Sequence, residues 1–296
     1  MTTSSETQKL VVVTGASTGM GAATARELAG RGFHVLAGVR RDKDADAVRA
    51  EHVEPVLLDI TEPERIAALA ARVGGDHRAL HALVNNAGIS VNAPVEALPL
   101  PEWRRQFEVN LFGHIAVTQA LLPALLDSRG RVVNISSVGG KVALPAYGAY
   151  AGSKFALEAV SDSLRRELAP LGVKVVVIEP GGVRTEITGN AVAAVEELAG
   201  RMSAELNERY GKLLQAVVGQ ARSFDTGGLS ADTAAKVIAD AVTHRKPRTR
   251  YTVGRDGAVL TRLARLLPDR ALDRLLAAGL RRHYPAPTGA AASASA

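Results

Sequence analysis

Short apolar runs alternate with longer stretches of helical pattern along the first 255 residues of the chain. The apolar runs, rich in valine, leucine and isoleucine, predict seven strands, at 10–14, 33–39, 56–58, 80–84, 131–135, 174–178 and 250–253. Helical periodicity or composition predicts helices between them, at 22–28, 44–51, 63–73, 101–109, 111–126, 155–168 and 230–242. Strands that alternate with helices at this spacing imply right-handed crossovers. The pattern therefore predicts an α/β, doubly wound fold: a seven-stranded, mostly parallel sheet with helices on both faces.

After residue 185 the pattern becomes mainly helical. Residues 186–224 predict either a lid over a site or a surface helix that only packs, and the sequence leaves both readings open. Residues 255–284 predict a helical C-terminal extension, in which two leucine- and arginine-rich stretches are separated at Pro268. Because no repeat or linker divides residues 1–284, we expect one domain there, followed by a disordered tail at 285–296.

Composition narrows the class of protein. Hydrophobic residues make up 47% of the 296 residues and charged residues 22%, which is typical of a globular protein with a large core. The absence of cysteine excludes disulfides, thiolate catalysis and zinc–cysteine sites. Residues 1–9 are polar and no run of about 18 apolar residues occurs, so we expect a cytoplasmic protein.

The net charge of +6 favours anionic ligands. Aromatic residues, which nucleic-acid sites interleave with basic ones, make up only 4% of the chain. We therefore expect no nucleic-acid partner, and a phosphorylated cofactor is the more economical use of the charge.

Three glycines follow the first predicted strand and precede a helix. Gly15, Gly19 and Gly21 fall where a strand, a turn and a helix start would present backbone N–H groups to a phosphate. Their spacing differs from the usual dinucleotide pattern, and a tight turn without a ligand is the alternative.

The second predicted strand ends at Val39 and is followed by Arg40 and Arg41, with no acid before Asp42. In dinucleotide sites an acid at this position bonds a ribose hydroxyl, whereas an arginine pairs with a 2′-phosphate. The sequence thus favours NADP over NAD, unless both arginines are simply solvated.

Tyr150 and Lys154 stand four residues apart in the stretch that opens the helix predicted at 155–168, so as part of that helix they would lie one turn apart on the same face. A lysine held against a tyrosine is expected to lower the pKa of the phenol and so to give a proton donor and acceptor near neutral pH. The alternative is two residues that merely share a helix surface.

The coarse topology brings these features together. The glycine loop, the Asn85 turn, Ser137 and the Pro180 loop all follow predicted strands, and ligands of parallel sheets bind outside the carboxyl ends of the strands. We expect a site there.

Read together, these motifs resemble those of the short-chain dehydrogenase/reductase family over residues 8 to about 254. The matching motifs are Thr14-Gly-Ala-Ser-Thr-Gly-Met-Gly21, Asn85-Asn-Ala-Gly88, Asn110, Ser137, Tyr150 with Lys154, and Pro180-Gly-Gly-Val-Arg-Thr185. The resemblance is to NADP-preferring members with a Rossmann-like subunit, and most to the hydroxysteroid and retinol dehydrogenase type.

The resemblance implies a role for each catalytic residue. Ser137, rather than Ser136, would polarise a substrate carbonyl, and Tyr150, rather than Tyr147, would transfer the proton. Lys154 would bond the nicotinamide ribose, and Asn110 would hold a water that relays protons to it.

It also implies cofactor contacts. Arg40 would hold the 2′-phosphate, Asp59 the adenine amino group and Thr185 the carboxamide. The full set is Gly15, Ser17, Thr18, Gly19, Met20, Gly21, Arg40, Asp59, Ile60, Asn86, Ala87, Gly88, Tyr150, Lys154, Pro180, Gly181, Val183 and Thr185.

The function so implied is reversible hydride transfer between NADPH and a ketone or aldehyde, or the corresponding alcohol, of hydrophobic character. A 3-ketoacyl-type ketoreductase and a non-catalytic NADP-binding sensor or scaffold are the alternatives. The resemblance suggests a homodimer or homotetramer. The leucine- and arginine-rich 259–282 stretch predicts either peripheral membrane contact or a helix that only packs or forms an interface.

Overall fold

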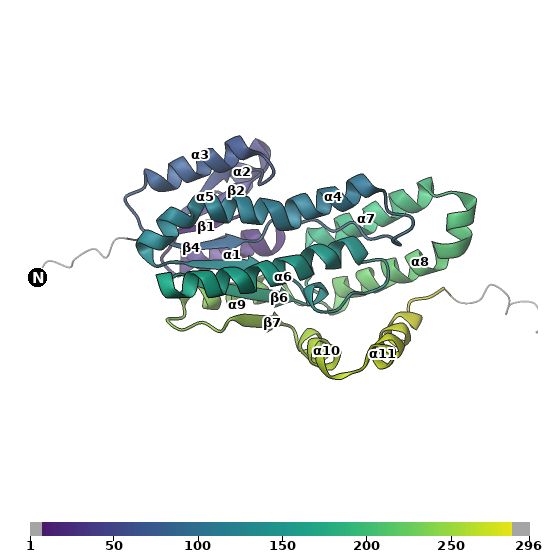
Figure 1. Ribbon diagram of the computed structural model, residues 1–296. Coiled ribbons are helices and arrows are strands. Elements are labelled where there is room, and N and C mark those ends of the chain that lie inside the picture. The colour runs from purple at the N-terminus through teal and green to yellow at the C-terminus, as the bar shows by residue number, and fades with distance from the viewer. Residues whose placement is uncertain (1–7, 286–296) are drawn as a thin grey trace, which may run out of the picture.

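The computed structural model describes residues 8–285, which form a three-layer α/β sandwich (Figure 1). The sheet has seven strands in the order β3-β2-β1-β4-β5-β6-β7, and every neighbouring pair is parallel. The strands are β1 (Leu10–Val13), β2 (His34–Val39), β3 (Val53–Leu57), β4 (Leu80–Asn85), β5 (Arg131–Ile135), β6 (Lys174–Pro180) and β7 (Arg250–Val253). The predicted doubly wound sheet is confirmed, with its reversal of strand order between β1 and β4.

Helices cover both faces of this sheet. Side chains from α1 (Gly19–Gly30), α2 (Asp42–Val48) and α9 (Ala231–Thr243) pack in one core layer. Side chains from α3 (Pro63–Gly74), α5 (Gly113–Ser128) and α6 (Gly148–Leu168) pack in the other. Alternate residues of β1 enter opposite layers, which is why its sequence is apolar throughout rather than alternating.

Several predicted boundaries differ from the structure. Helix α6 begins at Gly148 rather than at residue 155, so Tyr150 and Lys154 lie inside it. Strand β3 begins at Val53 rather than at residue 56, because Pro55, which signals a break in sequence, is tolerated on an edge strand. The second helix spans Asp42–Val48 rather than 44–51.

The two helices expected around Asn110 form one continuous helical stretch. It consists of α4 (Leu100–Phe107), the π-helical turn η1 (Glu108–Phe112) and α5, and Asn110 lies inside the π turn. By length and composition alone the helical stretch Leu100–Ser128 is long and apolar enough to cross a membrane, although the sequence predicts no such run. In the fold, Val117, Leu121 and Leu125 of this stretch pack in the core.

Helices α7 (Glu186–Arg201), α8 (Ala204–Gly227), α10 (Arg255–Leu266) and α11 (Asp269–Arg281) extend the fold past the end of the sheet. Helices α7 and α8 project together, and α10 and α11 form a separate pair beside β7 (Figure 1). The predicted helical extension is confirmed. The disordered tail predicted at 285–296 lies, except for Pro285, outside the described residues.

Candidate active site

A cavity of about 630 Å³ opens at the carboxyl edge of the sheet. Residues Met20, Asn86, Gly88, Ser137, Tyr147, Tyr150, Lys154, Pro180, Gly181, Val183 and Thr185 line its inner part. Side chains of α7, α8, α10 and α11 form the outer wall. The 186–224 region therefore contributes to the cavity and is not only surface packing.

The glycine loop is shaped by close approaches of the backbone. Gly15 has a φ of 63°, and a Cβ at that position would lie 2.7 Å from the Ala87 Cα atom. A Cβ at Gly21 would lie 2.2 Å from the Gly15 carbonyl oxygen. Both positions thus require glycine.

Asn86 holds this loop against β4. Its side-chain nitrogen donates to the carbonyl oxygens of Thr14 at 2.9 Å and Gly15 at 3.0 Å. The Thr14 hydroxyl accepts hydrogen bonds from the backbone N–H groups of Asn86 and Ala87. The Asn86 side chain, which is expected among the cofactor contacts, therefore donates its amide hydrogens to the loop.

The amino end of α1 is left available to a ligand. Thr18 occupies the N-cap position without a side-chain cap bond, Ser17 is half-buried beside it, and Met20 faces the cavity. Uncapped N–H groups at a helix start bind phosphate readily.

The two arginines after β2 have different surroundings. Arg41 forms a bidentate pair with Asp44, with Nε–Oδ2 at 2.7 Å and Nη2–Oδ1 at 3.0 Å. Arg40 is exposed and takes part in no ion pair within the part of the chain that the structure describes.

The residues expected near the adenine lie after β3. One carboxylate oxygen of Asp59 accepts from the backbone N–H and the hydroxyl of Thr61. Ile60 is buried in the core, and a Cβ at Gly113 would touch its side chain. Only the backbone of Ile60 is thus placed to contact a cofactor.

Ser137, Tyr150 and Lys154 meet at the bottom of the cavity. The Ser137 hydroxyl accepts from the Gly139 N–H at 3.0 Å. A Cβ at Gly139 would lie 3.3 Å from that hydroxyl and 3.1 Å from the Tyr150 ring, so the two side chains lie close together. Lys154 is 4% exposed, and its ammonium donates to the Ile135 carbonyl oxygen at 2.9 Å. Burial lowers the pKa of Lys154 to about 8, against the opposing charge of Glu158.

The expected lowering of the Tyr150 pKa is wrong. Burial raises the pKa of the Tyr150 hydroxyl, and the Ser137 side chain offsets this only in part. Lys154 donates to the end of β5 instead, so desolvation of the phenolate dominates. Tyr150 is consequently protonated at neutral pH.

The two competing side chains occupy different positions. Ser136 is 3% exposed, and its hydroxyl has no partner among the described residues. The Tyr147 ring packs edge-on to Tyr150, with centroids 6.4 Å apart, and burial raises its pKa to about 12.

A polar stripe that the sequence analysis missed lies along α4, η1 and α5. Buried polar side chains occur at every fourth position: Gln106, Asn110, His114 and Thr118. Gln106, Asn110 and His114 bond Val91, Ile89 and Ala87, respectively, in the segment after β4. Thr118 bonds Asn85, the last residue of that strand. The spacing of these four polar residues is visible in the sequence, but only the fold shows which backbone and side-chain groups they meet.

Asn110 therefore has a structural partner on each side. Its side chain accepts from the Ile89 N–H at 2.9 Å and donates to the Ile89 carbonyl at 2.9 Å and the Ser153 hydroxyl at 3.1 Å. Its expected role with a water stays a prediction.

The site fits a nicotinamide dinucleotide. The uncapped α1 start and the glycine loop would receive the pyrophosphate. A Cβ at Gly88 would lie 3.4 Å from Asn110 Oδ1 and 3.8 Å from Lys154 Nζ, so this glycine leaves room for a ribose beside the lysine. Thr185 lies across from Gly19, at the start of α7, where a carboxamide could be held.

Comparison with known proteins agrees with this geometry. Residues 9–196 match the family model for short chain dehydrogenases. Retinol dehydrogenase 7 of Mus musculus is 39% identical over 90% of this chain and 87% of its own length. Uncharacterized oxidoreductase YbbO of Escherichia coli is 36% identical over 91% and 94%.

Two solved structures are similar throughout. A short-chain dehydrogenase from Streptomyces avermitilis gives a TM-score of 0.73 at 31% identity, covering 94% of this chain and 96% of that one. A short chain dehydrogenase from Burkholderia cenocepacia, crystallised with NADP, gives a TM-score of 0.71 at 28% identity, covering 91% and 97%.

Proposed function

Because the chain belongs to the short-chain dehydrogenase/reductase family, whose members are nicotinamide-dependent oxidoreductases, we propose that it is an NADPH-dependent reductase of apolar ketones or aldehydes. The observation that carries this is the convergence of Ser137, Tyr150 and Lys154 on one cavity. The same residues serve the reverse oxidation of the alcohol.

The geometry assigns each side chain a task. When bound, the nicotinamide supplies the hydride to the carbonyl carbon. Ser137 donates a hydrogen bond to the carbonyl oxygen, and Tyr150 donates its proton as charge develops there, so that no free alkoxide forms. Burial raises the pKa of Tyr150, so the phenol is protonated at neutral pH, which is the form that the reduction needs.

The central test is Tyr150→Phe, with Tyr147→Phe as its matched control, since both rings line the cavity. We expect Tyr150→Phe to lose at least about 100-fold in kcat while NADPH binding is kept. Tyr147→Phe should remain within about tenfold of the parent. Turnover by Tyr150→Phe within tenfold of the parent would refute the mechanism.

The proposed preference for NADP rests on Arg40. Its exposed guanidinium follows β2 without a carboxylate partner, whereas Arg41 is occupied by Asp44. Arg40→Asp should shift the ratio of kcat/KM values from NADPH toward NADH, because the new carboxylate repels the 2′-phosphate and accepts from a ribose hydroxyl. Arg41→Gln should leave the ratio unchanged. An unaltered ratio in Arg40→Asp would refute the assignment of the 2′-phosphate to Arg40.

Support for an apolar substrate comes from the cavity wall. Val192 and Val195 of α7, Val217 and Phe224 of α8, and Leu263 of α10 face the space beyond Tyr150. A relative named a retinol dehydrogenase points the same way. A panel of steroid, retinoid, fatty-aldehyde and 3-ketoacyl substrates, followed by NADPH absorbance, separates this proposal from the ketoreductase alternative. Cofactor binding without any turnover would favour a sensor instead.

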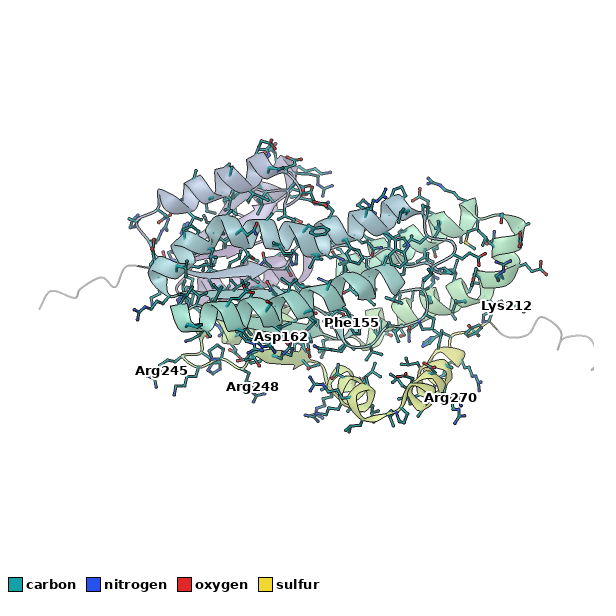
Figure 2. The ribbon with its side chains drawn as sticks, viewed as in Figure 1. Phe155, Asp162, Lys212, Arg245, Arg248 and Arg270 are labelled. Carbon is teal, nitrogen blue, oxygen red and sulfur yellow. The ribbon has the colours of Figure 1, made fainter. Side chains whose placement is uncertain are left out.

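We also propose peripheral contact of α10 and α11 with an anionic membrane. On α10 the exposed residues Arg255, Val259, Arg262 and Leu266 recur along one helical face, and Leu266 is 80% exposed. Residues 255–284 carry seven arginines and three aspartates, and Arg270 lies on the outer side of α11 (Figure 2). A surface of exposed apolar side chains among cations matches an anionic lipid surface, and it borders the cavity.

Flotation with phosphatidylserine-containing vesicles tests this contact. Leu266→Asp should weaken vesicle binding several-fold because it places a charge at the apolar surface. Leu171→Asp, at a residue that is 54% exposed in the turn η3 (Ala169–Leu171), is the matched control and should have no effect. Equal flotation of the parent and Leu266→Asp would contradict the proposal.

We further propose that copies of this chain pair through η1 and α6. Phe112 of η1 is 52% exposed and Phe155 of α6 is 44% exposed, which supports pairing of copies through these helices. We propose a homodimer or homotetramer in the cytoplasm. Sedimentation of the parent and of Phe155→Asp, which should be monomeric if this face pairs, tests the assembly, and cell fractionation tests the location.

A further inference from the structure

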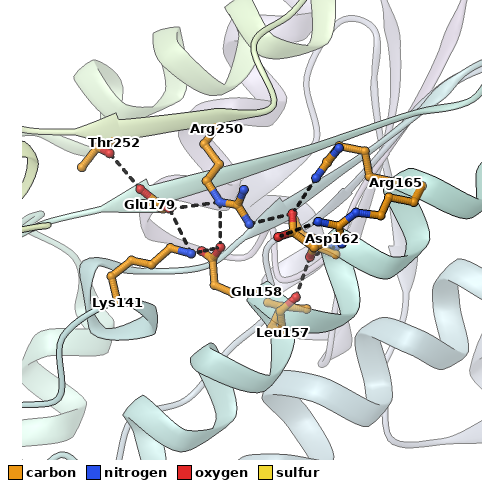
Figure 3. Close-up of polar contacts among 11 residues, drawn as sticks. Lys141, Leu157, Glu158, Asp162, Arg165, Glu179, Arg250 and Thr252 are labelled. Atoms are coloured by element: carbon orange, nitrogen blue, oxygen red, sulfur yellow. Dashed lines mark hydrogen bonds and ion pairs between the residues drawn. The ribbon is translucent and has the colours of Figure 1, made fainter. Parts of the chain in front are cut away.

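Four charged side chains meet beside α6, the helix that carries Tyr150 and Lys154 (Figure 3). We call them the ion cluster: Lys141, Glu158, Glu179 and Arg250. The Glu158 carboxylate lies 2.8 Å from the Lys141 ammonium and 3.0 Å from the Arg250 guanidinium. The side chains of Glu158 and Glu179 are each only 5% exposed.

Two further contacts extend the cluster. Arg250 also bonds Asp162 of α6 at 2.8 Å, and the Thr252 hydroxyl donates to Glu179 at 2.8 Å. Glu179 lies 3.4 Å from Arg250 and 3.8 Å from Lys141. The two acids therefore share the same two cations.

Each member belongs to a segment that carries part of the active site. Lys141 follows η2 (Val138–Gly140), the turn that begins at Ser137. Glu158 lies one turn after Lys154 on α6, and Glu179 precedes the Pro180 loop. Arg250 begins β7, which leads into α10. The cluster thus joins all four segments.

The turn η2 packs so closely on α6 that a shift of one would displace the other. A Cβ at Gly140 would lie 3.1 Å from the Glu158 Cγ atom, 3.1 Å from the Lys154 carbonyl oxygen and 2.7 Å from the Ser136 hydroxyl. Any movement of Glu158 away from Lys141 would therefore change how the Ser137 turn rests on α6.

Buried ion pairs such as Glu158 with Lys141 contribute little net stability, because the attraction between the charges roughly balances the hydration that both groups lose. One oxygen each of Glu158 and Glu179 is buried without a hydrogen bond from the described residues. An apolar contact would hold these elements together with less desolvation. The arrangement is better explained by a requirement for geometry and charge at this place.

Lys154 is the group that would sense this charge. On its own helix it has Tyr150 and Glu158 as neighbours; Asn110 of η1 and His114 of α5 face it from the other side. Glu158 supplies the opposing charge that acts on it, since His114 is neutral by burial.

We propose that Glu158 is a positioning residue of the reaction, which holds the Ser137 turn against α6 through Lys141 and keeps Lys154 in its charged form. The inference rests on the proposed function for its catalytic consequence, but not for its effect on cofactor binding. Removing the Glu158 charge lowers the pH at which Lys154 loses its proton. Removing Lys141 leaves the Glu158 charge less compensated and raises that pH.

The experiment compares Glu158→Gln, Lys141→Met and the parent, with Glu54→Gln as the control. Glu54 lies on the edge strand β3 and pairs with Arg72 and His34, so it is a half-buried carboxylate in an ion network away from the cavity. NADPH binding is followed by fluorescence between pH 6 and 10, and kcat is measured with the best substrate of the panel.

We expect the midpoint of the loss of NADPH affinity to fall by about one pH unit in Glu158→Gln and to rise in Lys141→Met. In both variants kcat should drop about tenfold or more, with KM for NADPH at pH 7 within about threefold of the parent. Glu158→Asp should restore the midpoint but not the full kcat, since its shorter side chain keeps the charge and loses the contact. Glu54→Gln should change neither quantity.

Midpoints that coincide with the parent in both variants would overturn the proposal. Where Glu158→Gln does not fold, the upward shift in Lys141→Met decides, because Lys141 is partly exposed and easier to replace. A parent protein that binds NADPH with the expected shifts but reduces no carbonyl would refute the proposed function and leave the control of Lys154 charge standing.

Discussion

Two glycines of the same helix show how differently single residues are constrained here. Gly21 and Gly30 both lie in α1. A Cβ at Gly21 would meet the Gly15 oxygen and, at 2.5 Å, the Asn86 side-chain nitrogen, whereas a Cβ at Gly30 would meet nothing within 4 Å. The first glycine lets the phosphate loop close on itself, and the second only ends the helix.

Gly21→Ala should therefore destabilise the protein by about 1–3 kcal/mol, as overpacking does, and weaken NADPH binding at least tenfold. Gly30→Ala should be neutral or stabilise by up to about 1 kcal/mol through the lower entropy of the unfolded chain. Urea unfolding and fluorescence titration measure the two effects. Similar losses in both variants would show that the close approach at Gly21 has no special role.

At the scale of elements, the polar stripe on α4, η1 and α5 fixes the segment that borders the cavity. Residues 86–92 follow β4 without continuing it, so their backbone groups need partners outside the sheet. Gln106 supplies both partners of Val91, since its side chain accepts from the Val91 N–H and donates to the Val91 carbonyl, each at 3.0 Å. The Gln106 side chain thus supplies the hydrogen bonds that a neighbouring strand would otherwise supply.

Gln106→Leu should cost about 1–3 kcal/mol, because it leaves the two buried backbone groups of Val91 unpaired. Gln119→Leu, at an exposed position of α5, should change the stability by no more than about 0.5 kcal/mol. Urea unfolding of the two variants provides the comparison. If Gln106→Leu is as stable as Gln119→Leu, the 86–92 segment does not depend on the stripe.

For the whole molecule, two buried histidines link stability to pH. Burial lowers the pKa of His114 to about 3 and that of His81 to about 4, from an ordinary value near 6.5. Above pH 6.5 neither the folded nor the unfolded chain protonates them. As the pH falls below 6.5 the unfolded chain takes up protons that the folded chain refuses, so the free energy of unfolding decreases.

Between pH 7.5 and 5.5 we expect the free energy of unfolding to fall by up to about 3 kcal/mol from these two groups. His81→Gln should remove up to about half of this dependence. His77→Gln, at a side chain that is 78% exposed, should leave it unchanged. Parallel pH profiles for the parent and His81→Gln would contradict the assignment.

The sequence by itself determined the order of strands and helices along the chain, the edge of the sheet that carries the cavity, and several residues that line it, such as Ser137, Tyr150 and Lys154. It could do so because burial on both faces makes parallel strands continuously apolar, and because the motifs follow those strands directly. A local signal gave a wrong boundary at Pro55. A proline normally argues against a strand, but β3 is an edge strand, and only the order of strands in the sheet reveals this.

Only the tertiary structure decided the properties that depend on partners distant in the chain. The pKa of Tyr150 rises because burial outweighs any help from Lys154, which spacing on a helix cannot show. The pairing of Gln106 with Val91, the ion cluster around Glu158 and the use of α10 and α11 as cavity wall likewise arise from crossovers that bring separate elements together. Periodicity records which face of an element is buried, but not which side chains it will meet.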